Sequence, residues 1–277
     1  MTDPKLIEHI KQAAGRMRKD MIELTYKGGA NGAHIAPGLS ITEIMATLYL
    51  GVMRDPAASD EVTGRDVFVL SKGHGALGYY TALHEVGIIS REQLYTYEDN
   101  GGSFPGQPSK NRALGIDYSG GSLGLGLSYG IGVALCNRFK GSDGRVYVLM
   151  GDGECNEGTV WESVMFAAYQ KVDNITAIVD CNGMQSDGNT CDILSYDIPA
   201  VWKAWGWHVI ECDGHDVAAL LSAFGQRRQD MPNVILAKTI KGCGVSFMEN
   251  DKAWHHSRLT DAQRDEALVQ LCEKAGE

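Results

Sequence analysis

The sequence predicts an α/β protein with a doubly wound, mainly parallel sheet that carries helices on both faces. Short apolar runs alternate along the chain with longer stretches of helical spacing, and this alternation is typical of right-handed βαβ units. Polar turns rich in glycine follow the apolar runs, at the expected ends of the strands. The 277 residues can bury a full core, and no linker rich in Pro, Gly or Ser divides them. We therefore expect one domain over residues 1–277.

Two helices are predicted in the N-terminal region. Asp3 and Pro4 form a cap and first-turn pair, and apolar residues follow at helical spacing. Ser40 and Glu43 have the spacing of a capping box just before the apolar run of residues 44–53. This spacing predicts that a second helix starts there.

Five strands are predicted in the rest of the chain. They cover residues 67–70, 146–150, 175–180, 207–212 and 233–238. Helical stretches follow several of them, at residues 71–87, from about 157, and at 216–228. Thr260 and Gln263 have the spacing to cap a terminal helix, and His215 is expected to orient a turn. Because ligands bind beyond the carboxyl ends of parallel strands, we expect the functional site in the turns after these strands.

Composition excludes several classes of function. A net charge of -10 argues against nucleic-acid binding. Charged residues near the N-terminus stand where a signal peptide would need an apolar run. Residues 118–137 are uncharged, but their six glycines and three serines predict a buried glycine-rich segment rather than a membrane span. The seven cysteines are scattered without a C-x-x-C pair, so we expect reduced thiols in a cytoplasmic protein.

An aspartate between two glycines follows the second predicted strand. Asp152 lies in the sequence GDG, and Asn182 occupies the equivalent turn 30 residues later, after the next strand. A carboxylate would repel a phosphate directly, and the GDG turn has no lysine at Walker spacing. Carboxylate, amide and backbone carbonyl oxygens are hard ligands for Mg²⁺ or Ca²⁺. The pattern therefore predicts a cation that lies between Asp152 and a bound phosphate.

The spacing of GDG, Glu157-Gly158 and Asn182 resembles the thiamine-diphosphate fingerprint. More broadly, the chain resembles the N-terminal, diphosphate-binding half of transketolase, in the version that is split into two polypeptides. The stretches that carry this resemblance are residues 28–40, 70–75, 120–135 and 241–256. The last of them resembles a family pattern that ends in W-H-G, where this chain has Trp-His-His.

The resemblance assigns roles residue by residue. It implies that Mg²⁺ is held by Asp152, Asn182 and the carbonyl of Met184. It implies that the diphosphate contacts Gly153, His74 and His255, and that the cofactor is lined by Gly121 and Leu123. His34 would face the substrate, and the three histidines 34, 74 and 255 would donate and accept protons. The doubled histidine leaves open which of His255 and His256 contacts the diphosphate.

The resemblance also implies a reaction, and a second domain that is carried on a separate chain. Transketolases use the carbanion of thiamine diphosphate to transfer a two-carbon glycolaldehyde unit from a ketose to an aldose phosphate. The glutamate that generates this carbanion lies in a pyrimidine-binding domain. That domain is expected on a separate chain, in an α₂β₂ assembly that is active only when complete. Glu157 would then serve at the subunit interface.

Three alternatives remain at this point. The GDG…Asn metal site also occurs in the α subunit of 2-oxo-acid dehydrogenases and related decarboxylases. A non-catalytic paralogue would keep the fold without the activity. Gln107 replaces a substrate-facing histidine of the family, either by neutral drift or because the donor is a branched, deoxy or sulfonated ketose. Since the ANGAHIAPG stretch also departs from the family pattern, we favour a changed donor.

Overall fold

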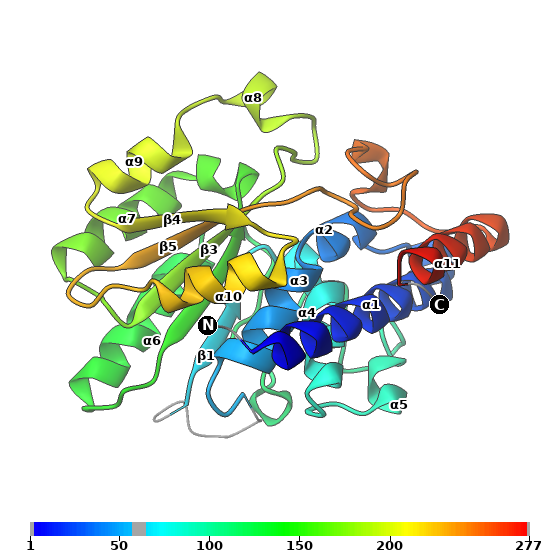
Figure 1. Cartoon of the computed structure of the whole chain (residues 1–277), viewed down its shortest axis with the longest axis horizontal. Helices are drawn as coiled ribbons and strands as arrows, with labels where there is room; N and C mark the ends of the chain where they lie inside the picture. Colours follow the sequence, from blue (N-terminus) through cyan, green and yellow to red (C-terminus); the bar gives the residue numbers. More distant parts are fainter. Residues whose placement is uncertain (1–2, 57–64, 276–277) are drawn as a thin grey trace.

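The computed structural model describes residues 3–56 and 65–275. Its centre is a five-stranded parallel sheet with the order β1-β2-β3-β5-β4 (Figure 1). The strands are β1 (Val67–Leu70), β2 (Val146–Gly151), β3 (Ile175–Cys181), β4 (His208–Asp213) and β5 (Asn233–Lys238). The predicted α/β class with a parallel sheet is confirmed, and each predicted strand is present.

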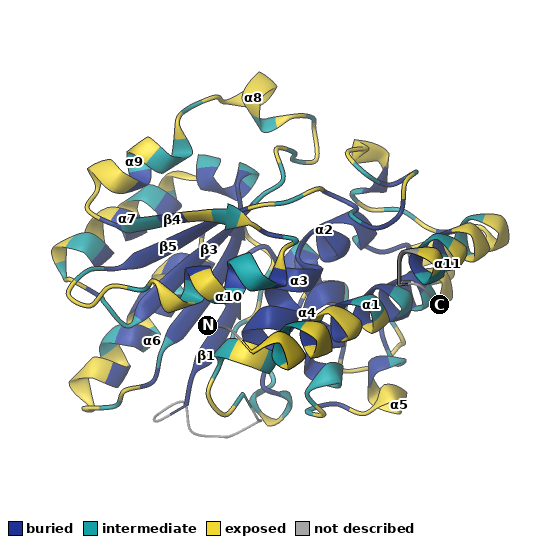
Figure 2. Cartoon of the chain, in the orientation of Figure 1, coloured by how far each residue is buried: buried dark blue, intermediate teal, exposed yellow. Residues whose placement is uncertain are grey.

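Helices cover both faces of this sheet. They are α1 (Pro4–Lys27), α2 (Ile35–Ser40), α3 (Thr42–Thr47), α4 (Ala76–Glu85), α5 (Arg91–Leu94), α6 (Gly126–Phe139), α7 (Gly158–Tyr169), α8 (Thr190–Ile193), α9 (Ile198–Ala204), α10 (Val217–Gly225) and α11 (Asp261–Ala275). One core contains residues of α1 to α4 and α10, and a second contains residues of α6, α7 and α9. Figure 2 shows the edge strand β4 as partly exposed, the other strands as mostly buried, and the outer faces of the helices as exposed.

Alternation along the strands divides their side chains between the two cores. On β1, Phe68 and Leu70 belong to the first core, whereas Val67 and Val69 belong to the second. Since both faces are covered, β1 and β2 are buried throughout and are continuous apolar runs rather than alternating ones. In the β2–β3 register, Gly151 lies opposite Asp180. The turns that follow these two strands are therefore neighbours.

The predicted helix ends are confirmed at both termini of the chain. The Asp3 side chain accepts a hydrogen bond from the Lys5 amide at 2.9 Å, and α1 begins at Pro4. The Gln263 amide donates to the Thr260 hydroxyl at 3.3 Å, just before α11.

None of the helices in the described part of the chain has both the length and the apolar character that a membrane crossing needs.

The predicted capping box at Ser40 is wrong. Ser40 ends α2, a helix that the sequence analysis did not predict, and α3 begins two residues later without a side-chain cap. The Ser40 hydroxyl instead donates to the Asp180 carboxylate at 2.8 Å. A buried carboxylate at the end of β3 needs donors more than an α-helix amide needs a cap, because an unsatisfied buried charge is far more costly.

Two other segments differ in part from expectation. The helix predicted over residues 71–87 begins only at Ala76, because residues 73–75 form a single 3₁₀ turn. Within the glycine-rich segment 118–137, α6 starts at Gly126, and its outer face is exposed. The segment is thus buried on one side only.

We predict that Gly130→Ala destabilises the protein, whereas Gly132→Ala does not. A Cβ at Gly130 would lie 2.5 Å from the Val148 Cγ2 atom of β2, so α6 would have to move off the sheet. A Cβ at Gly132, on the exposed face of the same helix, meets no atom within 4 Å. We expect a loss of about 1–3 kcal/mol for Gly130→Ala and a gain of about 0.4–1 kcal/mol for the control, measured by urea unfolding. Equal stabilities of the two variants would contradict the packing.

Candidate active site

A cavity of about 220 Å³ lies where the carboxyl ends of the central strands meet. It collects predicted site residues from five separate turns: His74, Leu123, Asp152, Gly153, Asn182, Met184 and His255. Lys72, Glu154, Glu157 and Lys241 also line it. The structure therefore brings most of the predicted residues together, although they are up to about 180 positions apart in the sequence.

Asp152 and Asn182 occupy adjacent turns, as the β2–β3 register requires. The Asp152 carboxylate accepts hydrogen bonds from the amides of Gly153 at 2.8 Å and Gly183 at 2.7 Å. The Asn182 Oδ1 atom accepts one from the Met184 amide at 3.0 Å. Burial, and then the nearby Asp180, raise the pKa of Asp152 to about 6. A cation beside Asp152 would favour its charged form.

This donor set fits a magnesium ion better than a transition metal. The described residues contain no cluster of three or more His, Cys, Asp or Glu side chains that could hold a metal. One carboxylate and one amide oxygen suit Mg²⁺, which takes few protein ligands and completes its shell with phosphate oxygens and water.

A buried ion pair lies directly beneath this turn. Lys72, which follows β1, pairs with Asp180 near the end of β3, and both side chains are almost fully buried. Asp180 also accepts hydrogen bonds from the Ser40 and Thr239 hydroxyls and from the Asn182 amide. Burial alone would raise the pKa of Asp180, but Lys72 and these donors hold it below its usual value.

Four histidines form a cluster beside the cavity. The His34 ring centroid lies 6.0 Å from that of His74, 5.5 Å from His255 and 4.5 Å from His256. The rings of His74 and His255 are 5.2 Å apart. Burial is the largest factor that lowers the pKa of His34 to about 4 and of His255 to about 3, and it also lowers that of His74. These three rings are therefore neutral near pH 7, and each offers one donor and one acceptor.

Lys241 determines the tautomer of one of these histidines. Its Nζ atom lies 2.9 Å from the His255 Nδ1 atom. An ammonium group can only donate, so Nδ1 accepts and the proton of the neutral ring is on Nε2. Burial, together with Lys72, lowers the pKa of Lys241 to about 8. Lys241 and His255 thus place an ammonium group and an N–H donor side by side.

His34, Gly121 and Gln107 do not line the cavity itself. His34 contacts it through His74 and His255. The side chain of the exposed Gln107 lies against Gly73 and Gly121. A Cβ atom added to either glycine would be 3.1 Å from the Gln107 Oε1 atom. A Cβ at Gly73 would also be 3.0 Å from the Gly121 amide, so the close approach of these two loops requires glycine.

The comparison with protein families identifies the chain. A family model described as the thiamine diphosphate binding domain of transketolase matches residues 12–273. The chain belongs to the transketolase family. It is 37% identical over 266 residues to an apulose-4-phosphate transketolase subunit of Actinobacillus succinogenes, in a match that covers 95% of this chain and 96% of that relative. It is 38% identical over 270 residues to a 6-deoxy-6-sulfo-D-fructose transketolase subunit of a Clostridium species, covering 96% and 97% of the two chains.

Solved transketolase structures share the fold. The crystal structure of the Campylobacter jejuni transketolase is 25% identical and superposes with a TM-score of 0.85, covering 99% of this chain and 43% of that one. The chain therefore spans less than half the length of that transketolase. The predicted family, fold and enzyme class are confirmed. The match to transketolase also decides against the α subunit of a 2-oxo-acid dehydrogenase.

Sequence reasoning missed several polar residues of this transketolase site. Lys72 and Lys241 both lie in turns after strands, and their position there was the available signal. Glu154, two residues after Asp152, is buried and accepts hydrogen bonds from the Gly124 amide at 2.8 Å, the Gly151 amide at 3.1 Å and the Ser71 hydroxyl. It joins the glycine-rich turn at 120–124 to the GDG turn.

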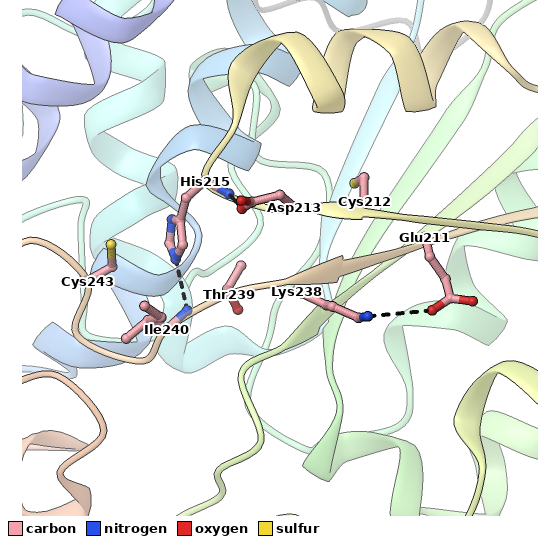
Figure 3. Close-up of a pocket in the computed structure, with 8 residues that line it drawn as sticks. All are labelled: Glu211, Cys212, Asp213, His215, Lys238, Thr239, Ile240 and Cys243. Carbon is pink, nitrogen blue, oxygen red and sulfur yellow. Dashed lines mark hydrogen bonds and ion pairs between the residues drawn. The ribbon is translucent and has the colours of Figure 1, made fainter.

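A second polar network supports the turn that carries Lys241. The His215 Nδ1 atom lies 2.9 Å from the Glu43 carboxylate. On the other side of the ring, the Ile240 amide donates to the Nε2 atom at 2.8 Å (Figure 3). Arg18 donates to both carboxylate oxygens of Glu43, at 2.5 Å to Oε1 and at 2.7 Å to Oε2, the oxygen that also contacts His215. His215 is expected to cap or orient a turn, and its hydrogen bond with Ile240 orients the turn that leads into Lys241. A separate open pocket at the ends of β4 and β5 borders this network.

We predict that Glu43→Gln destabilises the chain by about 3–5 kcal/mol at pH 7, because it leaves the buried Arg18 without its partner. Burial alone would raise the pKa of Glu43, but Arg18 and His215 lower it to about 2, below the value in the unfolded chain. Its contribution is therefore complete above about pH 4.5 and is lost as the pH falls toward 2. We expect the difference in the free energy of unfolding between the wild type and Glu43→Gln to decrease below about pH 4.5. Urea unfolding measured from pH 7 to pH 3 checks this.

The matched control is Glu23→Gln, which removes the partially exposed ion pair with Arg264. We expect it to change stability by only about 0.2–1 kcal/mol. Similar losses for the two variants, or a gap for Glu43→Gln that does not change with pH, would refute the role assigned to the buried pair.

Proposed function

We propose that this chain is the diphosphate-binding subunit of a two-chain transketolase that uses thiamine diphosphate and Mg²⁺, which Ca²⁺ could replace. The observation that carries the proposal is the placement of Asp152 and Asn182 in adjacent turns, in one cavity with Lys241, His74 and His255. Oxygen ligands for a cation thus lie next to donors for a phosphate. When bound, the cofactor would supply the carbanion that attacks the donor ketose.

The residues divide between the cation, the cofactor and the sugar. Asp152, the Asn182 Oδ1 atom and the Met184 carbonyl would hold the cation. Lys241 joins Gly153, His74 and His255 as the group that would bind the diphosphate, and Gly121 and Leu123 would line the rest of the cofactor. Lys241 is suited to this role because it lines the cavity and its hydrogen-bond partner, His255, is a neutral ring.

The histidine cluster would handle the sugar hydroxyl groups. His34 has a pKa of about 4 and His255 of about 3, so their rings carry no charge near neutral pH. A neutral imidazole can accept a proton from one hydroxyl and donate to another. His34, His74 and His255 are therefore suited to orient a polyhydroxylated substrate and to move its protons.

We further propose that a second subunit carries the pyrimidine-binding domain and completes an α₂β₂ enzyme in the cytoplasm. Two relatives that this chain covers almost fully are named as transketolase subunits. Large apolar side chains on α6 and α7, and at the N-cap of α6, are also exposed: Leu125, Phe139, Met165, Phe166 and Tyr169. Exposed apolar side chains on two helices that contact each other favour a protein partner. Glu157, the N-cap residue of α7, lines the cavity and would lie at that interface.

The donor is proposed to be a ketose other than the usual one. Gln107 lies over the Gly73–Gly121 contact beside His74, so its amide faces the region where the sugar would bind. The relatives are named for apulose 4-phosphate and for 6-deoxy-6-sulfo-D-fructose. We infer that this chain also serves an unusual ketose and an aldose phosphate acceptor.

Thiamine diphosphate binding should depend on the metal and on Asp152. We expect calorimetry to show binding that is lost in EDTA, and that is lost in Asp152→Ala even with added Mg²⁺. Asp187→Ala is the matched control, because this exposed carboxylate lies in the loop after Asn182. Circular dichroism must show that both variants are folded. Full affinity in folded Asp152→Ala would exclude the proposed metal site.

The purified chain should have no transketolase activity alone. We expect activity to appear on addition of the partner subunit, together with a mass that corresponds to two copies of each chain in light scattering. Charged substitutions at Phe139 or Tyr169, which are 93% and 83% exposed, should weaken this assembly without unfolding the chain. Two-carbon transfer by the isolated chain would disprove the need for a partner.

Gln107→His should shift donor preference toward xylulose 5-phosphate. An amide can hold a hydroxyl but cannot take a proton, whereas an imidazole can do both. We expect kcat/KM for xylulose 5-phosphate to rise by roughly threefold to tenfold in the reconstituted enzyme, the scale of one hydrogen bond. If the wild type already uses that donor efficiently and the substitution changes nothing, the altered-donor proposal is incorrect.

A further inference from the structure

The two histidines of the Trp-His-His turn have different surroundings. His255 lines the cavity and lies 2.9 Å from the Lys241 ammonium group. His256 is exposed, is not among the residues that line the cavity, and contacts the His34 ring at 4.5 Å in an edge-to-face arrangement. His255 thus lies on the cavity side of the cluster, and His256 lies on the side that faces solvent.

The position of His256 is well defined although its side chain is exposed. Its turn is joined to the His34 loop by two backbone hydrogen bonds between Ala33 and Ser257, of 2.8 and 3.0 Å. Gly32 lies under the ring, because a Cβ there would be 3.2 Å from the His256 Cε1 atom and 2.9 Å from the Ser257 carbonyl oxygen. Gly32 also has a φ of +67°, which disfavours any side chain. The His34 loop therefore leaves room for this imidazole.

The rings form a series that leads outward from the cavity. His255 is half-buried, His34 lies 5.5 Å from it, and His256 lies 4.5 Å beyond His34 at the surface. If the diphosphate lies in the cavity, a substrate bound on its outer side would meet the outer end of this series. The imidazole of His256 is the exposed member of the cluster, whereas the other three rings are partly buried.

We propose that His256 is a substrate-contacting residue that helps to select the sugar, and that it acts together with Gln107. Relative to the pattern that this chain resembles, one imidazole is absent at residue 107 and one is gained at residue 256. Gln107 lies over the loop that carries His74, and His256 packs on His34. The two departures therefore flank the same pair of histidines. The proposal rests on the proposed function, since it concerns the sugar of that reaction.

The test compares His256→Ala, His256→Asn, Gln107→His and the double variant His256→Ala with Gln107→His. Each is combined with its partner chain to form the complete enzyme, which is then assayed with a panel of donor ketoses and one aldose phosphate acceptor. His9→Ala is the control, because it removes an exposed imidazole on α1, outside the site. Thiamine diphosphate affinity and the midpoint of urea unfolding are measured for every variant.

We expect His256→Ala to raise KM for the preferred donor by roughly threefold to tenfold, with smaller changes in kcat, as for the loss of one substrate contact. His256→Asn, which keeps a donor and an acceptor, should restore most of this loss. Cofactor affinity and urea midpoint should stay at the wild-type values. The effects of the two single changes on donor preference should not multiply in the double variant, because both residues border the same histidines.

Three results would overturn the inference. KM values within about twofold of the wild type for every donor would show that His256 does not contact the sugar. A loss of cofactor affinity or stability, with KM unchanged, would assign His256 a structural role. A wild-type complex that binds thiamine diphosphate but transfers no two-carbon unit from any donor would overturn the proposed function as well.

Discussion

The buried ion pair between Lys72 and Asp180 is the interaction on which the site depends. It joins the end of β1 to the end of β3, and the same carboxylate binds hydroxyls from α2 and from the turn after β5. Removing one partner of such a pair costs about 3–5 kcal/mol, a large part of the about 5–15 kcal/mol that stabilises a typical domain. Four segments that are far apart in the sequence are therefore held at one point.

This pair also determines which charges remain for ligands. Asp180 is neutralised by Lys72, whereas the Asp152 carboxylate is held by two backbone amides and has a raised pKa. Lys241 has a neutral histidine as its neighbour and lies in the same cavity. A carboxylate and an ammonium group thus line the same space. A metal ion bound to an anionic phosphate is the kind of ligand that satisfies both.

The sequence was sufficient to predict the strands and most of the cavity, and the reason is physical. Parallel strands end at one edge of a sheet, so turns such as those of Asp152 and Asn182 must be neighbours once the strands are assigned. Pairings between distant segments could not be predicted in this way. The role of Ser40 depends on a carboxylate 140 positions away, and local spacing favoured a capping box instead. The different surroundings of His255 and His256 depend on the backbone hydrogen bonds between residues 33 and 257, and no local pattern encodes a contact between such distant segments.

The apolar outer face of α6 and α7 has a consequence for how the chain is made in the cell. Phe139 and Tyr169 are almost fully exposed on helices that pack directly on the sheet, so the face cannot be hidden by a small rearrangement. Copies of the chain without a partner would present this surface to one another and to quality-control proteases. If the proposed second subunit covers this face, synthesis of the two polypeptides in equal amounts would limit this loss. A shortage of one polypeptide would then lower the abundance of the other through degradation.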